Sequence, residues 1–125
     1  IKNCSYFIKR LRDNNFVVWK IFSEYNIGDS RKWTILVNPG MESVYVTCHI
    51  NEEYLDYQPT YSFTDDGSRF KNTLKVKTNS MEVIMTHLFE HGVTSIKNCI
   101  QTDLTVEGMA EIVCQIFKEK FIEGN

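Results

Sequence analysis

The sequence predicts one α+β domain with an N-terminal helix, a four- to five-stranded antiparallel meander sheet, and two C-terminal helices packed on one face. Three observations predict this architecture. Apolar residues recur at helical spacing near both ends of the chain, they alternate at strand spacing in the middle, and short turn sequences separate the middle segments. Helices on one side of an antiparallel sheet are the usual way to cover its apolar face.

The three predicted helices each carry an apolar stripe. The first is expected to end near Asn14-Asn15, and its apolar positions are Ile1, Cys4, Ile8 and Leu11. The second begins at an N-cap, Ser80, and ends at Gly92, with a stripe of Met81, Ile84, Met85, Leu88 and Phe89. The third is capped by Asp103 or Thr105, with a stripe of Met109, Ile112, Val113, Ile116, Phe117 and Phe121. Residues 93–103 are compatible with a short strand.

The predicted strands lie between these helices and are joined by short turns. The first strand runs from Phe16 to Ile27 and is rich in β-branched and aromatic residues. The turns that follow contain Gly28-Asp29-Ser30, Asn38-Pro39-Gly40 and Asp65-Asp66-Gly67-Ser68. Alternating apolar positions mark the later strands, namely Trp33, Ile35, Val37, Val44, Val46, Cys48, Ile50, Tyr61, Phe63, Phe70, Leu74 and Val76. Short connections of this kind favour an antiparallel meander.

Length and composition fit one domain. The chain has 125 residues, of which 42% are apolar, which is enough for one core and too little for two ordinary domains. We therefore expect a single domain over residues 1–125. Because the first residue is Ile1 rather than Met, we also expect a fragment of a longer protein.

Charge and cysteine usage narrow the expected surroundings of the protein. The formal net charge is −2 and the basic residues are scattered, so nucleic acid is not an expected partner. No apolar run approaches the roughly 18 residues of a membrane span, so no membrane association is expected. The four cysteines, Cys4, Cys48, Cys99 and Cys114, form no close pair. They are typical of reduced, buried thiols and predict an intracellular protein, cytoplasmic or nuclear.

One segment resembles a known superfamily. Residues 52–63 read Glu-Glu-Tyr-Leu-Asp-Tyr-Gln-Pro-Thr-Tyr-Ser-Phe. This segment is similar to the stretch after the third strand in RWD and ubiquitin-conjugating-enzyme-like domains. Tyr54, Pro59 and Phe63 match that stretch, whereas Leu55 stands where the family has a second proline. The resemblance covers this segment closely and the order of elements loosely.

The resemblance implies a noncatalytic member of that superfamily. Catalytic members carry a His-Pro-Asn turn and then an acceptor cysteine about one strand beyond the Phe. Residues 65–70 contain neither feature, and the next cysteine is Cys99. Noncatalytic members act as adaptors in ubiquitin-pathway complexes or as globular heads of kinetochore proteins. We therefore expect a protein-interaction module that works as an adaptor or scaffold, with no enzymatic activity and no cofactor.

Aromatic and β-branched side chains are the candidates for binding a partner. A sheet covered by helices on one side leaves its other side available, and aromatic side chains are common interface anchors. One face of the first strand would carry Val17, Trp19, Ile21 and Tyr25. The predicted partner-binding residues are those of its other face and nearby aromatics, namely Phe16, Val18, Phe22, Trp33, Tyr54 and Tyr57. The prediction requires exposure of Phe16, Val18 or Phe22. The partner is another protein, and a homodimer or heterodimer is open.

Two alternative functions rest on other residues. His87-Leu88-Phe89-Glu90-His91 has the H-x-x-E-H spacing of a class of zinc peptidases, with Glu107 or Glu111 available as a third ligand, and predicts a zinc-dependent hydrolase or a zinc site as the first alternative. The plainer interpretation is a histidine at a helix C-terminus, where a cation is favoured.

The second alternative uses a lysine-rich strand. Lys71, Lys75 and Lys77 place several charges on one strand face, which could bind RNA if stacking aromatic residues lay beside them. A solvated strand face or protection of a sheet edge is the plainer interpretation.

Overall fold

The computed structural model describes residues 2–27, 30–38, 43–51, 59–64, 73–91 and 97–122. Its elements run α1 (Lys2–Asp13), β1 (Val17–Ile27), β2 (Ser30–Asn38), β3 (Val44–Asn51), β4 (Thr60–Thr64), β5 (Thr73–Lys77), α2 (Met81–His91), β6 (Lys97–Gln101), α3 (Val106–Phe117) and a final π-helical turn, η2 (Lys118–Ile122). The predicted α+β class is confirmed, with an N-terminal helix, a largely antiparallel sheet and two C-terminal helices.

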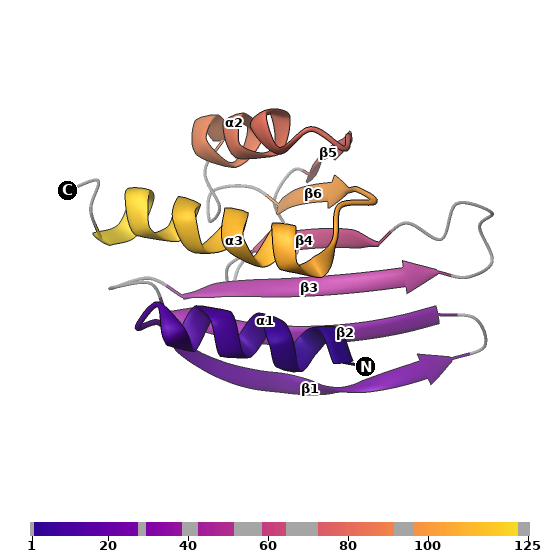
Figure 1. Cartoon of the computed structure of the whole chain (residues 1–125). Coiled ribbons are helices and arrows are strands. Elements are labelled where there is room, and N and C mark those ends of the chain that lie inside the picture. Colours follow the sequence, from indigo (N-terminus) through magenta and orange to yellow (C-terminus); the bar gives the residue numbers. More distant parts are fainter. Residues whose placement is uncertain are drawn as a thin grey trace.

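The strands form one six-stranded sheet in the order β1-β2-β3-β4-β6-β5. Helices α1 and α3 lie side by side across one face of this sheet, and α2 contacts α3 and β6 (Figure 1). We call this side the helix-covered face and the opposite side the open face. The described helices all lie on the first side, as predicted.

The edge of the sheet formed by β4, β6 and β5 departs from a simple meander. Strands β1 to β4 pair antiparallel in chain order, as predicted. Strand β6 then pairs antiparallel with β4 and parallel with β5. The fifth predicted strand therefore exists, but it is separated from β4 by the short strand that residues 93–103 allowed. A parallel pair requires a crossover connection, and α2 lies in the connection between β5 and β6.

The turn after α1 decides which side of β1 faces the core. Asn15 has a positive φ of 69°. The Asn15 N–H donates to the Arg12 carbonyl and the Phe16 N–H donates to the Leu11 carbonyl. This is the Schellman pattern of a helix C-terminus, in which the residue after the left-handed one packs back against the helix. Phe16 is accordingly buried.

Two helix N-termini carry the predicted caps. The Ser80 hydroxyl accepts from the Val83 N–H at 3.2 Å, and the Thr105 hydroxyl accepts from the Gly108 N–H at 3.1 Å. Each bond satisfies one backbone donor that a helix N-terminus leaves unpaired. Of the two candidates for the last helix, Thr105 is the cap.

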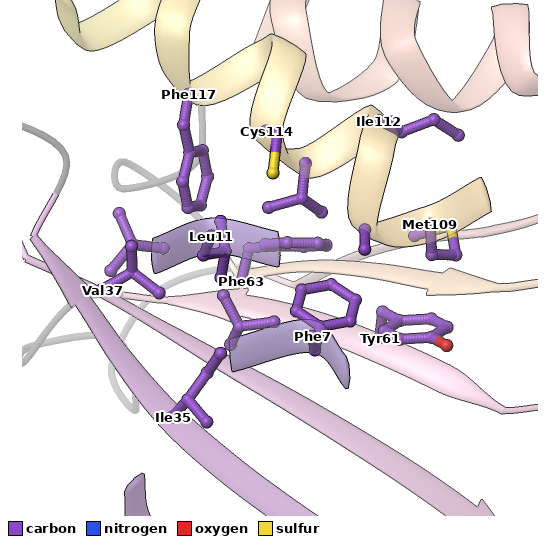
Figure 2. Close-up of a cluster of buried hydrophobic side chains, with 14 of the residues drawn as sticks. Phe7, Leu11, Ile35, Val37, Tyr61, Phe63, Met109, Ile112, Cys114 and Phe117 are labelled. Atoms are coloured by element: carbon purple, nitrogen blue, oxygen red, sulfur yellow. The ribbon is translucent and has the colours of Figure 1, made fainter. Parts of the chain in front are cut away.

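The core lies between the helix-covered face and the helices α1 and α3. Phe7 sits at its centre, with its ring 5.3 Å from that of Trp33 and 6.0 Å from that of Tyr61. Figure 2 shows Phe7 and Leu11 of α1 between the strand residues and the side chains of α3. Phe16 meets Phe117 edge-on at 6.0 Å, which joins the start of β1 to the end of α3.

Three of the predicted partner-binding residues lie on the helix-covered face of the sheet. Phe16, Val18 and Trp33 are each at most 3% exposed, so the prediction that Phe16 or Val18 is exposed was wrong. The physical reason is the Schellman turn, which directs Phe16 and then Val18 toward α1. Tyr54, Tyr57 and the side chain of Phe22 lie outside the described part of the chain.

Candidate functional site

The open face of β1 carries a run of exposed apolar side chains. Trp19 is 61% exposed, Val17 is 53% exposed and Ile21 is 37% exposed. Strand alternation puts them opposite Val18, which faces the core. We call Val17, Trp19 and Ile21 the β1 patch. Large apolar side chains exposed as neighbours, rather than singly, are typical of interaction sites.

The pairing of the strands extends this patch inward across the sheet. Trp19 pairs with Leu36 of β2, and Leu36 pairs with Tyr45 of β3. Both neighbours are half-buried. Because paired residues in an antiparallel sheet share a face, Trp19 stands at the outer end of a row of apolar side chains. A partner that covers Trp19 would also meet Leu36 and Tyr45.

The backbone of β1 is irregular beside the patch. Its register against β2 shifts between Lys20 and Phe22 and again between Phe22 and Tyr25. Each shift places an extra residue on β1, which is the signature of a β-bulge. Bulges at a sheet edge disfavour the addition of another strand. The side chains of the β1 patch, rather than the backbone edge, are therefore the better candidate for contact.

Small polar side chains occupy the middle of the open face. The Thr34 and Thr47 hydroxyl oxygens are 3.0 Å apart, and the Ser62 hydroxyl lies 3.5 Å from the Cys99 sulfur. The pairing places these four residues in one row across β2, β3, β4 and β6. This row lies beside the apolar row of Trp19 and is much smaller in volume.

The charged side chains described on the open face are lysines. Lys75 and Lys77 of β5 are exposed, and their neighbour Val76 packs against the core instead. Lys32 and His49 pair with each other on β2 and β3. Among strand residues whose side chains the structure describes, none on this face is Asp or Glu. The open face therefore combines an apolar end at β1 with a cationic end at β5.

The zinc hypothesis gains no ligand set from the described residues. His87 is half-buried on α2, while the side chain of His91 lies outside the described part of the chain. Among the described residues, no three His, Cys, Asp or Glu side chains gather closely enough to hold a metal ion. The zinc site stays a prediction that these residues do not test.

The cysteines are all buried, and none is in a disulfide. Burial raises the pKa of Cys48 to about 12 and that of Cys114 to about 11, and it also raises the pKa of Cys4. These three thiols are therefore protonated at neutral pH. A thiol nucleophile needs an accessible thiolate, and these three have neither the access nor the charge.

Comparisons with known proteins add no relative. No family model, curated protein or solved structure matches the chain. Within the described part of the chain, no helix has the length and apolar character needed to cross a membrane.

The β1 patch was separated correctly by strand periodicity but assigned to the wrong side. The alternation groups Val17, Trp19, Ile21 and Tyr25 on one face, and the exposure of the first three agrees with it. Beyond Ile21 the bulge pairs Phe22 with Thr34 of the open face, so the predicted alternation does not continue. The missed signal was Asn14-Asn15, because an Asn that ends a helix in the left-handed conformation turns the next residue toward that helix. That signal would have placed Phe16 and Val18 inside and Trp19 outside.

Proposed function

We propose that this domain is a noncatalytic protein-interaction module that binds its partner through the β1 patch. The observation that carries the proposal is the exposure of Trp19, at 61%, between two other exposed apolar side chains. Tryptophan is among the residues most enriched at the energetic centres of interfaces. Burying one large apolar side chain contributes roughly 1.5–3 kcal/mol, so burying this patch would supply much of a specific affinity.

The charge of the open face favours one kind of partner. Lys75 and Lys77 are exposed on the same face as Trp19, with Lys32 between them in the sheet. A partner with an apolar anchor for Trp19 and carboxylates farther along would complement both ends. The lysines would chiefly raise the association rate and select against basic competitors.

RNA binding is supported less well by this arrangement. The lysines lie on β5 and Trp19 lies on β1, at opposite edges of six strands. With adjacent strands about 4.8 Å apart, the separation is roughly 24 Å. The row that pairs through to Lys75 consists of Thr34, Thr47, Ser62 and Cys99, which offer no ring, and the aromatic side chains Trp19 and Tyr45 lie in the neighbouring row toward β1. Protein is therefore the proposed partner.

We extend the proposal to an adaptor or scaffold of the RWD-like type in an intracellular complex. Pro59 directly precedes β4 and Phe63 is buried in that strand, which suits the matched segment. Four buried thiols without a disulfide suit a reducing compartment. The parallel β5–β6 pair goes beyond a simple meander, so the family assignment rests on the segment and the element order alone.

The proposal can be tested with the full-length protein in cells. A photo-crosslinking amino acid at position 19 should trap one partner, while the same group at position 107, exposed in the first turn of α3, serves as the matched control. The trapped protein is then purified and its affinity measured by calorimetry. Trp19→Ala should weaken binding at least thirtyfold, which corresponds to about 2 kcal/mol. Equal affinity for wild type and Trp19→Ala would refute the proposed site.

A further inference from the structure

A second apolar surface lies on the helical side of the molecule, between α2 and α3. It is a hollow of about 370 Å³ lined by Met85, Thr86, Phe89, Glu90, Ile116 and Glu119. We call it the α2–α3 groove. Its floor is apolar and its edges carry carboxylates. It is remote from the β1 patch, because the helices and the open face are on opposite sides of the sheet (Figure 1).

The groove exists because α2 uses only part of its apolar stripe for packing. Ile84 and Leu88 are fully buried, whereas Phe89 is 50% exposed and Met85 is half-buried. Met85 and Phe89 are four residues apart, so they stand one turn apart on the same side of α2. Part of the predicted stripe, chiefly Phe89, thus faces solvent beside α3.

The exposed ring of Phe89 makes a cation–π contact with Lys120. The Lys120 ammonium nitrogen lies 5.4 Å from the centroid of this ring. Cations are attracted to the faces of aromatic rings by the ring quadrupole. A lysine of another molecule would make the same kind of contact with Phe89 by displacing Lys120.

The apolar surface continues on the other side of α2. A neighbouring hollow of about 340 Å³ is lined by Glu82, Val83, Thr86, His87 and Glu90. Val83 is exposed in it, and Glu90 borders both hollows. The helix α2 is therefore a ridge with an apolar hollow on each flank.

The charge around these hollows is acidic. Glu82, Glu90 and Glu119 border them, and they outnumber the basic group that a described contact places there, the Lys120 ammonium over the Phe89 ring. Glu119 also accepts a hydrogen bond from the Gln115 amide at 3.3 Å, one turn earlier, which holds its carboxylate at the rim. An occupant with positive charge beside its apolar residues would complement this rim, whereas an acidic or anionic-lipid surface would be repelled.

From these contacts we infer that the α2–α3 groove is a second docking site, which takes an amphipathic helix with a basic flank. A helix laid into a groove between helices places apolar anchors at i, i+3 or i+4 against Met85 and Phe89, above the buried Ile116. Its lysines or arginines meet Glu90 and Glu119. The inference rests on different residues from the β1 patch and stands independently of it. Two docking surfaces of opposite charge would let one domain bridge two partners.

The test uses the protein and a synthetic amphipathic peptide, fluorescently labelled, with leucines along one face and lysines beside them. Anisotropy should show saturable binding, weakened at least tenfold by Phe89→Ala. Glu90→Gln combined with Glu119→Gln should weaken binding several-fold and flatten its salt dependence. Backbone amide NMR shifts should concentrate in α2 and α3. Trp19→Ala is the matched control and should leave the peptide affinity unchanged.

Three results would overturn the inference. The first is no binding of the lysine peptide, or equal binding of a matched peptide with glutamates in place of the lysines. The second is peptide binding that Phe89→Ala leaves unchanged. An unchanged thermal midpoint of this variant would establish that its fold is preserved. The third is binding of the protein to anionic vesicles that Phe89→Ala abolishes, which would assign the surface to a membrane.

Discussion

The two tryptophans of this protein lie on neighbouring strands and have opposite surroundings. Trp33 of β2 is 2% exposed, and its ring contacts Phe7 of α1 and Tyr61 of β4. Trp19 of β1 is 61% exposed on the other face of the same sheet. One side of the sheet therefore packs against the helices, while the other presents exposed apolar side chains at β1. In a β-strand, a single step along the chain separates these two roles.

The largest effect expected from this comparison is on stability. Trp33→Ala removes a fully packed ring and should lower the free energy of unfolding by about 3–5 kcal/mol. Trp19→Ala removes an exposed ring and should change it by no more than about 0.5 kcal/mol. Urea unfolding of both variants checks the contrast. Similar losses in the two variants would mean that Trp19 is packed in solution.

The next largest effect on stability is expected at the turn after α1, which sets which face of β1 points to the core. Asn15 holds a left-handed φ of 69°, which glycine tolerates without strain and a β-branched residue does not. Asn15→Val should therefore lower the free energy of unfolding by about 1–2 kcal/mol. Asn15→Gly, the matched control, should be close to neutral. If chemical denaturation finds the valine variant as stable as the glycine variant, the Schellman turn does not fix the start of β1.

The covered face should also respond to pH. Burial raises the pKa of Cys48 in the folded protein to about 12 from an ordinary value of 9.0. The unfolded chain releases this proton first, so the stabilising difference is complete below pH 9 and is lost between pH 9 and about 12. The free energy of unfolding, measured with urea under reductant, should be lower at pH 10 than at pH 8. Cys48→Ala should show a shallower fall, and Trp19→Ala should keep the wild-type slope. An unchanged slope in Cys48→Ala would contradict burial of this thiol.

The smallest effect on stability is expected at the cationic edge of the open face. Lys75→Ala with Lys77→Ala should change the free energy of unfolding by less than about 0.5 kcal/mol, since both side chains are exposed. The same double variant should slow association with the partner and reduce the salt dependence of its rate. Stopped-flow measurements at two salt concentrations would show this. An unchanged association rate would remove the lysines from the proposed binding face.

Much of the fold could be predicted from the sequence because its signals are local. The caps at Ser80 and Thr105, the end of α1 at Asn15 and the alternation of β2 and β3 each depend on a few neighbouring residues. The partnership of β5 with β6 could not be predicted, since strand order depends on contacts between distant segments. The prediction of the site residues was wrong for a related reason. Periodicity separated Trp19 from Val18 but could not say which face the helices cover.

The most direct measurement of the central claim compares the two tryptophans in one sample. The chain contains two tryptophans, Trp19 and Trp33, so fluorotryptophan labelling should give two ¹⁹F resonances. The exposed one is identified by its solvent isotope shift and by its loss in Trp19→Phe. Addition of the purified partner should move the Trp19 resonance and abolish its isotope shift, while the Trp33 resonance stays in place. A Trp19 resonance that remains unmoved and solvent-exposed in the saturated complex would contradict the account.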